Sequence, residues 1–434
     1  MMISRRSLLS LMLAMAFLWL SESARYGLSA GWDSDIVRLW VVSQYIKQRV
    51  DPWRVSYETL HLNYGPASGE NRERIRNLRV FEVHPHLRTD GITGVIPEFG
   101  PPTSTYPPPG MLIFTFLAGW VPQAWLLPGW MLVNFALILA LAWALLRWRQ
   151  NIEAEQAQHV IMDPEARPSM ISLPAPAFVL LLSLAWPPVQ EVVRTSQYGI
   201  LMALLILVGF LTIKSSQFLA GICFSLALFK PHVTLPYLIV PLLAGRWRTL
   251  ATIAVTQLIA LLGIAWWLHT PPWTLIGTWL AISPYMFQGA YTVQELINAA
   301  GFGTSPFALV IPLLMILFSL GWCWWNRECP PFLAVSFLSL VSVFWMYHER
   351  YDYVVLLMPI VAACLLERFP DGRGHSLHKV LLPAFVLLGL GLSDYAYLSD
   401  HPIAHVVRWM GRLSLYGLLV CFAWLMRRRP ARTA

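Results

Sequence analysis

An all-α polytopic membrane protein is the fold class that the sequence predicts, and three observations predict it. Hydrophobic residues make up 57% of the 434 residues and charged residues only 12%, which is not the composition of a soluble globular chain. Apolar runs recur along the chain, for example at residues 8–20, 200–213 and 380–392. With their Ser, Thr and Gly neighbours they reach the roughly 20 residues that cross a bilayer core. Because backbone polar groups must be satisfied within hydrocarbon, these spans are expected to be helices.

About twelve segments are candidate spans of one membrane-embedded domain covering residues 1–434. They are residues 7–28, 107–122, 127–148, 171–190, 196–214, 218–244, 249–269, 305–325, 331–347, 352–368, 378–398 and 405–427. Arg5 and Arg6 at one end and Arg427–Arg429 at the other place both termini in the cytoplasm, so the number of crossings is even. Twelve fits if 218–244 is one helix interrupted at Lys230-Pro231; if that pair marks a hairpin, another segment is re-entrant.

The N-terminus, two arginines followed by apolar residues, is similar to a secretory signal. We expect an uncleaved signal anchor, because the residues that follow begin the candidate active site on a tethered loop. Cleavage near Ser29-Ala30 is the alternative.

Two longer loops face the outside in this topology. Residues 29–106 form the first and longest extracytoplasmic loop, and residues 270–304 form the second. The first begins with residues 36–49, which lack Gly and Pro and are expected to form an interfacial helix with Trp40 and Tyr45 near the headgroups. Asp51-Pro52 ends that helix. The loop at 149–170 is also placed outside by parity.

Several function classes are excluded by the composition. The net charge of +8 comes from short loops and the C-terminus, which indicates cytoplasmic retention of those segments and no binding to nucleic acid. The five cysteines and eleven histidines show no ligand spacing, so no zinc site and no disulfide framework is expected. There is no Gly-rich nucleotide cradle, and nothing in the chain requires a metal or another cofactor.

Carboxylates at the start of the first outer loop are the most informative polar residues. Asp33 and Asp35 follow the first span directly, and an ionisable group near lipid persists where it is solvated, paired or used. A positioned carboxylate that takes the proton of an attacking hydroxyl contributes a factor of roughly 10² to 10⁴. Asp35 is equally suited to cap the helix that follows it, and the two roles are compatible.

Several motifs, in this order and spacing, resemble glycosyltransferase family 87 of the GT-C membrane superfamily, whose members use polyprenyl-phosphate sugars. They are Asp35 through Asp51-Pro52-Trp53, Tyr106-Pro107-Pro108-Pro109, Ser196-Gln197-Tyr198-Gly199, Ala220-Gly221 through Lys230-Pro231, and Gly245 through Arg248. The resemblance covers roughly residues 31–250. Ser196 and Gly199 depart from the Gly and Asn of the family motif, and Val293-Gln294-Glu295-Leu296 is a weak counterpart of another one.

The resemblance, together with the chemistry of the side chains, leads to expected roles for nine residues. Asp35 is expected to be the general base of an inverting transfer, and Asp33 to orient the acceptor. The residues expected to bind the donor phosphate are Lys230, His348, Arg350 and Arg194. Those expected to contact the sugar or the acceptor are Gln197, Gln294 and Tyr106, with the Tyr106–Pro109 run also shaping the entry to the second helix.

The expected function is therefore that of a glycosyltransferase in the bacterial cytoplasmic (inner) membrane, with its active site facing outward. It would pass a sugar, which is mannose in the resembled family, from a polyprenyl-phosphate carrier to a glycolipid, glycan or protein hydroxyl. Two alternatives stay open. A polysaccharide ligase or polymerase with a lipid-diphosphate donor would use the outer-loop arginines between residues 72 and 88. A transporter of lipid-linked saccharides would show paired, interrupted spans, which the sequence lacks.

Overall fold

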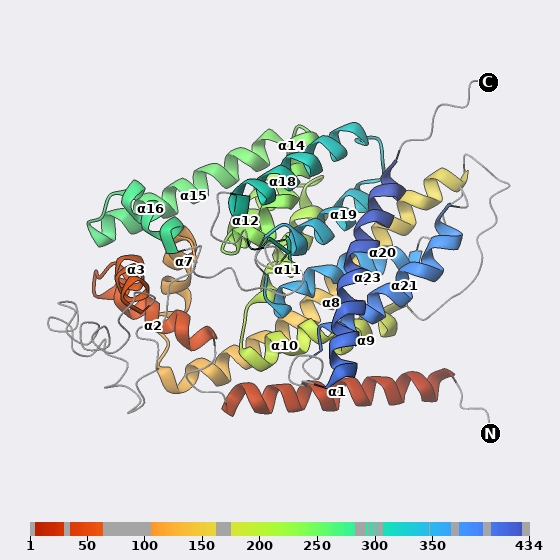
Figure 1. Cartoon of the computed structure of the whole chain (residues 1–434), viewed down its shortest axis with the longest axis horizontal. Coiled ribbons are helices and arrows are strands. Elements are labelled where there is room, and N and C mark those ends of the chain that lie inside the picture. Colours follow the sequence, from red (N-terminus) through yellow and green to blue (C-terminus); the bar gives the residue numbers. More distant parts are fainter. Residues whose placement is uncertain are drawn as a thin grey trace.

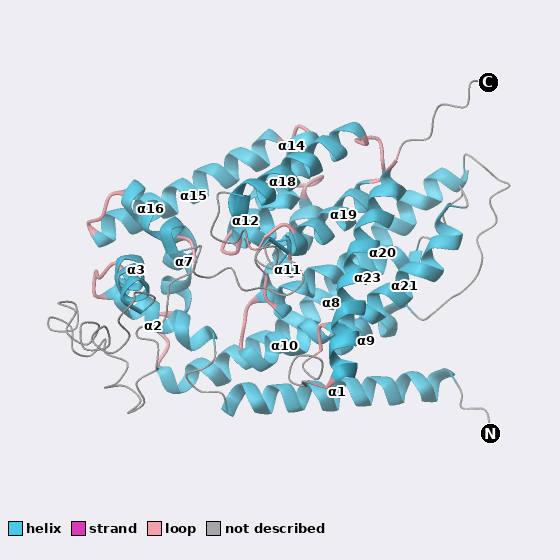
Figure 2. Cartoon of the chain, viewed as in Figure 1, coloured by secondary structure: helices cyan, strands magenta, loops and turns pink. Residues whose placement is uncertain are grey.

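The structure is a computed structural model that describes residues 5–29, 35–63, 106–161, 175–282, 292–293, 296–297, 301, 307–346, 348–365, 373–393 and 401–427. Within these ranges every regular element is a helix and none is a strand (Figure 2). The all-α class expected from composition is therefore confirmed for the described part of the chain.

The helices vary widely in length. In chain order they are α1 (Arg5–Ser29), α2 (Asp35–Lys47), α3 (Pro52–Asn63), α7 (Pro108–Ala118), α8 (Gln123–Ile161), α9 (Ala175–Ala185), α10 (Pro187–Thr195), α11 (Gly199–Thr212), α12 (Gln217–Ala227), α13 (Pro231–Thr234), η3 (Leu235–Leu238), α14 (Ile239–Leu243), α15 (Trp247–Leu268), α16 (Pro272–Ile282), α18 (Phe307–Trp325), α19 (Pro331–Phe344), η5 (Arg350–Leu356), α20 (Leu357–Leu365), α21 (Arg373–Gly391) and α23 (Pro402–Met426).

The helices pack around a central group formed by α10, α11, α12 and η5. Helix α1 runs along one edge of the molecule beside α9 and α10, and α15 runs along the opposite edge (Figure 1). Helices α2, α3, α7 and α16 gather at one end, whereas α21 packs against α23 at the other. Segments distant in sequence therefore meet in the middle of the fold.

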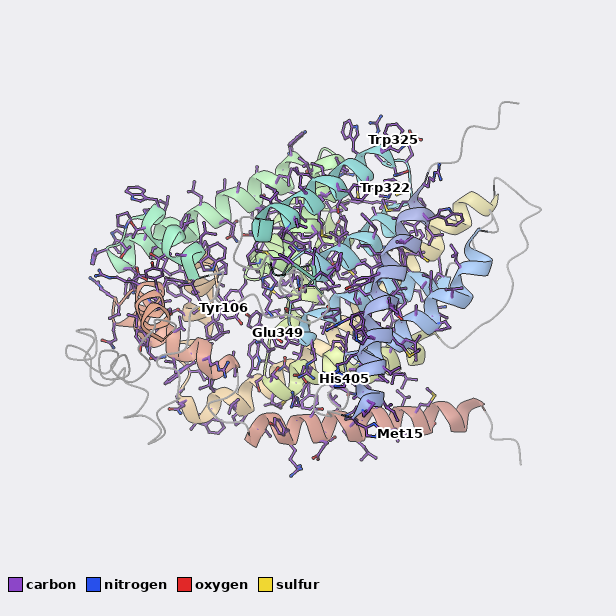
Figure 3. All side chains as sticks on the ribbon, viewed as in Figure 1. Met15, Tyr106, Trp322, Trp325, Glu349 and His405 are labelled. Carbon is purple, nitrogen blue, oxygen red and sulfur yellow. The ribbon has the colours of Figure 1, made fainter. Side chains whose placement is uncertain are left out.

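The outer surface carries many large apolar side chains. Leu117 is 76% exposed and Trp273 75% exposed, and Met15 and Trp325 point outward on opposite edges of the molecule (Figure 3). A water-soluble surface does not expose apolar side chains on this scale, so this surface is suited to lipid.

Three helices in the described ranges are long and apolar enough to cross a membrane on their own: Gln123–Ala154, Trp247–Leu268 and Pro402–Met426. The twelve-crossing topology stays a prediction.

Prolines break two of the expected spans. The segment expected at 171–190 is not one helix, because α9 ends before Trp186 and α10 restarts at Pro187. The segment at 218–244 is interrupted at Lys230-Pro231, as the sequence predicted, with α12 before the break and α13, η3 and α14 after it. Proline lacks an N–H and clashes with the preceding helical turn, so each restart begins with proline.

Two other expected boundaries were wrong. The span expected at 352–368 begins as a 3₁₀-helix, η5, and becomes α-helical only at Leu357. Helix α8 continues through Ile161 and so enters the segment 149–170 that we expected to be a loop. Its Glu, Ala, Gln and Arg residues favour helix, and Arg149 pairs with Glu153 at 3.1 Å one turn on.

The helix expected within residues 36–49 forms as α2, and its side chains are held by neighbouring helices. Tyr45 is only 2% exposed, and Trp40 Nε1 donates to the carbonyl of Val121. Trp267 Nε1 on α15 donates to the carbonyl of Ile46. The Tyr45 ring is therefore covered by protein, packed with Val41 of α2 and Val55 of α3, and its place near the headgroups stays a prediction.

The first residues of α3 contact the segment that precedes α7. The carboxylate Oδ1 of Asp51 accepts hydrogen bonds from the backbone N–H groups of Trp53 and Arg54, each at 3.0 Å, which caps α3. Trp53 is fully buried and its Nε1 donates to the carbonyl of Tyr106 at 2.8 Å. The Asp51-Pro52-Trp53 motif therefore positions Tyr106.

Candidate functional site

Tyr106 stands at the entry to α7, within an aromatic cluster. Pro107 is the N-cap of α7 and Pro108 its first helical residue, so the proline run sets the helix start. The Tyr106 ring stacks on Phe229 with ring centroids 4.9 Å apart, and its edge meets Tyr198 at 5.3 Å. Three distant segments are brought together by this cluster.

The Ser196–Gly199 stretch is the tight connection between α10 and α11. Ser196 adopts the left-handed conformation with φ 54°, where the resembled family has glycine. A Cβ on Gly199 would stand 2.6 Å from the carbonyl oxygen of Tyr351, so glycine lets η5 approach. Gln197 is fully buried, and its carbonyl accepts from Trp130 Nε1 at 3.3 Å. The close approach of η5 explains Gly199, whereas at Ser196 the backbone conformation is one that glycine adopts more easily.

Lys230 is a buried cation at the helix break. Its ammonium donates to Oδ1 of Asp352 at 2.5 Å, with the two side chains 2% and 1% exposed. The same ammonium lies 4.3 Å from the ring centroid of Tyr351 and 4.8 Å from that of Tyr198. Two aromatic faces and a carboxylate therefore stabilise a charge that would otherwise be costly to bury.

Asp352, the partner of Lys230, is a residue to which the sequence reasoning gave no role. It lies on η5, and its Oδ2 accepts the backbone N–H of Glu349 at 3.2 Å, while the Glu349 side chain caps the backbone of Asp352 in return. Asp352 is 122 residues from Lys230, so no sequence spacing links them. The only available signal was a carboxylate beside an apolar segment.

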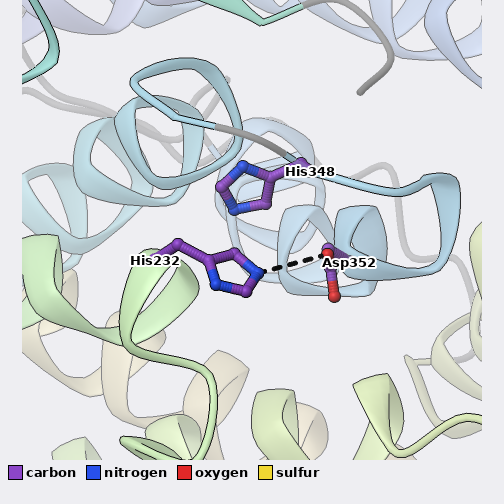
Figure 4. Close-up of side chains that lie close together, drawn as sticks. All are labelled: His232, His348 and Asp352. Atoms are coloured by element: carbon purple, nitrogen blue, oxygen red, sulfur yellow. Dashed lines mark ion pairs between the residues drawn. The ribbon is translucent and has the colours of Figure 1, made fainter. Parts of the chain in front are cut away.

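His348 lies fully buried between α19 and η5, close to His232 of α13. The two rings meet edge to face with centroids 4.9 Å apart, and His232 Nε2 lies 3.7 Å from Asp352 Oδ2 (Figure 4). Burial, with a contribution from His232, lowers the pKa of His348 to about 3. The ring is therefore neutral near pH 7, and binding a phosphate as a cation would require proton uptake.

His232, His348 and Asp352 could also hold a metal ion. One nitrogen or oxygen atom of each lies within 4.8 Å of the others.

Arg194 and Arg350 meet at one carboxylate. Arg194, in the last turn of α10, forms a bidentate salt bridge with Glu191, donating two hydrogen bonds of 2.8 Å each. Arg350 Nη2 of η5 lies 3.5 Å from Oε1 of the same Glu191. Arg194 also lies over the ring of Tyr26 on α1 at 5.1 Å. Glu191 thus joins two of the candidate phosphate-binding residues, a connection that the sequence did not indicate.

The predicted site residues do not all fall within the described part of the chain. Helix α2 begins at Asp35, but the side chain of Asp35 and the whole of Asp33 and Gln294 lie outside the described residues. Their predicted roles stay predictions. The structure brings Tyr106, Lys230 and His348 into one contiguous network, and Arg350 joins it through its neighbours Tyr351 and Asp352.

This network can offer positive charge and aromatic surface to a ligand. Lys230, Arg194 and Arg350 are each held by a carboxylate. Pre-oriented cations of this kind stabilise negative charge that develops on a departing group.

Comparison with known proteins gave one match. The sequence model of glycosyltransferase family 87 matches residues 105–359, which is more than half of the chain. The matched range includes Tyr106, Lys230 and Arg350, and it begins after Asp33 and Asp35. No curated protein and no solved structure matches the chain.

Proposed function

The chain belongs to glycosyltransferase family 87 and is a membrane glycosyltransferase, and from this premise we propose that its donor is a polyprenyl-phosphate sugar. The sugar is mannose, and the acceptor is a hydroxyl of a glycolipid, glycan or protein at the outer face of the bacterial cytoplasmic membrane. The mannose and the polyprenyl carrier follow from the family resemblance.

The observation that carries this proposal is the buried Lys230 at the break between α12 and α13. A lysine within apolar surroundings needs an anionic partner, and Asp352 holds its ammonium in one place at 2.5 Å. A lipid-linked donor diffuses within the bilayer, and we propose that its phosphodiester approaches this cation from there. The fixed charge then favours the state in which the phosphate leaves.

In the proposed reaction, the acceptor hydroxyl attacks the anomeric carbon of the sugar from the face opposite the phosphate. Asp35 accepts the hydroxyl proton as the new C–O bond forms. The bond between the anomeric carbon and the phosphate oxygen breaks, and its electron pair leaves with the polyprenyl phosphate. The anomeric configuration is inverted.

Arg194 and Arg350 are proposed to contact the phosphate oxygens, because a guanidinium offers two parallel donors to such a group. Their shared partner Glu191 keeps the two side chains near each other. Tyr106, Gln197 and Gln294 are proposed to contact the sugar or the acceptor. His348 contributes to phosphate binding only in a protonated state.

The test is a transfer assay with purified full-length protein and polyprenyl-phosphate mannose. We expect Asp35→Asn to lower kcat by roughly 10² to 10⁴, while KM for the donor changes little. Glu22→Gln is the matched control, because Glu22 is an exposed carboxylate of α1 that pairs with the neighbouring Arg25. Full activity of a correctly folded Asp35→Asn variant would refute Asp35 as the base.

A second arm of the assay compares donors with one and with two phosphates between lipid and sugar. Transfer from the monophosphate donor is expected. Transfer from the diphosphate donor alone would instead support a ligase or polymerase. Translocation of the intact lipid-linked saccharide without transfer would support a transporter.

A further inference from the structure

Two histidines and a carboxylate converge beside Lys230 although they come from three separate segments. His232 lies on α13, His348 on the connection after α19, and Asp352 on η5. One ligand atom of each lies within 4.8 Å of the others, and the three side chains face a common space (Figure 4). Two imidazoles and one carboxylate are a donor set found at protein metal centres.

The orientation of His348 is the strongest single observation. Its Nδ1 lies 2.8 Å from the carbonyl oxygen of Met346. A carbonyl oxygen can only accept, so Nδ1 carries the hydrogen and Nε2 carries the lone pair. That Nε2 is buried and has no hydrogen-bond partner among the described residues. A buried acceptor without a donor is destabilising, whereas a cation bound to Nε2 would satisfy it.

A backbone carbonyl on the remote nitrogen is also how metal-bound histidines are held. Such a contact fixes the tautomer and the ring direction. The Met346 carbonyl therefore presets His348 as a ligand through Nε2.

Asp352 retains coordination capacity despite its ion pair. Lys230 occupies Oδ1, whereas Oδ2 accepts one backbone N–H at 3.2 Å and lies 3.7 Å from His232 Nε2. A carboxylate oxygen has more than one lone pair, so Oδ2 can also bind a cation placed between it and the imidazoles. The carbonyl of His232 is held by Trp345 Nε1 at 2.6 Å, which fixes the backbone of that ligand.

We propose that His232, His348 and Asp352 form a binding site for one divalent transition-metal cation of the zinc or cobalt type. Imidazole nitrogens favour these ions over Mg²⁺ and Ca²⁺, which prefer oxygen ligands. Three protein ligands leave at least one coordination position open. The sequence had indicated no such site, because the ligands follow no recognisable spacing.

Lys230 makes this site weaker and easier to test. Its ammonium neutralises part of the Asp352 charge and repels a nearby cation. Replacing Lys230 by Met removes that repulsion and leaves the carboxylate free to face the metal. The Lys230→Met variant is therefore expected to bind the cation more tightly than the native chain.

The experiment uses the purified full chain in detergent, without a polyhistidine tag and stripped by a chelator. Titration with Co²⁺ alone is followed by visible absorption, and the bound metal is counted by mass spectrometry. We expect one cobalt ion per chain. We expect His348→Ala and His232→Ala to weaken binding by at least about tenfold, and Lys230→Met to strengthen it.

His405→Ala is the matched control, since His405 is an exposed histidine of α23 next to Arg408 and its loss should leave cobalt binding unchanged. Absence of binding by the native chain, or equal binding by His348→Ala, would overturn the metal site and leave the cluster as a hydrogen-bonded ion pair. No donor is present in this titration, so its failure is distinguishable from failure of the proposed transferase function.

Discussion

Lys230 and Arg194 are both cations at the ends of helices in the centre of the fold, but the protein holds them in different ways. Lys230 pairs with a carboxylate 122 residues away, and both side chains are almost fully buried. Arg194 pairs with Glu191 one turn back on its own helix, and it stays 21% exposed. The Lys230 site is thus closed by tertiary packing, whereas the Arg194 site is local and partly open.

The difference teaches how the two cations can serve one anionic ligand. A buried pair cannot rearrange without exposing an unpaired charge, so Lys230 provides a charge at a fixed place. Glu191 is buried, but the side chains of Arg194 and Arg350 stay 21% and 17% exposed, so their guanidinium groups are more accessible to a phosphate than the Lys230 ammonium is. Four substitutions test this contrast.

The largest effect is expected at Asp352. Asp352→Leu leaves the Lys230 ammonium buried without its carboxylate, and we expect a loss of about 3–5 kcal/mol of stability, seen as a lower Tm in detergent. The double variant with Lys230→Met and Asp352→Leu removes both charges and should recover most of the loss. A single variant as stable as the native chain would show that the pair does not hold η5 in place.

The next largest effect on stability is expected for Gly199→Ala. The added Cβ would stand 2.6 Å from the Tyr351 carbonyl, so η5 must move, at a cost of about 1–3 kcal/mol. The measurement is thermal unfolding together with donor KM, because η5 also carries Asp352. Gly417→Ala on α23 meets nothing within 4 Å and should be neutral or stabilising. Equal behaviour of both variants would contradict the close approach of η5.

A smaller effect is expected at Glu191. Glu191→Gln removes the charge that Arg194 and Arg350 share but keeps a carbonyl acceptor, and since both arginines stay partly exposed we expect a loss of about 0.5–1.5 kcal/mol. Donor KM should change more than Tm, because the two guanidinium groups lose their common position. Glu153→Gln, which breaks the pair with Arg149 on α8, is the control. If Glu191→Gln destabilised the protein as much as Asp352→Leu, the contrast between the two sites would fail.

The smallest effect is expected at Ser196. Ser196→Gly relieves a left-handed backbone at φ 54°, and the gain is offset in part by the added freedom of the unfolded chain. We expect a stabilisation of less than about 1 kcal/mol, observed as a slightly higher Tm. Ser216→Gly should lower Tm instead, since the Ser216 side chain caps α12 by accepting from Leu219 N. A lower Tm for Ser196→Gly would mean that the serine hydroxyl matters more than the backbone.

Local sequence patterns predicted most of the helices of the described part of the chain. The apolar runs became helices, and the Lys230-Pro231 pair interrupted a helix because proline cannot continue one. The boundary at Ile161 was missed because a polar segment of strong helix formers continued α8 beyond its apolar part. The burial of Tyr45 was missed because Val55 of α3 packs against it, and the sequence does not show that α3 turns back onto α2.

The sequence by itself determined that the chain is an apolar helical protein, and it singled out Lys230, Arg350 and Tyr106 through their chemistry and the family motifs around them. These properties depend on composition, helix propensity and short-range motifs, which each segment carries alone. Only the tertiary structure decided that Asp352 pairs with Lys230, that Glu191 joins two arginines, and that His232 faces His348. The physical reason is that such pairs form where packing brings distant backbone segments within a few ångströms, and no local preference encodes that distance.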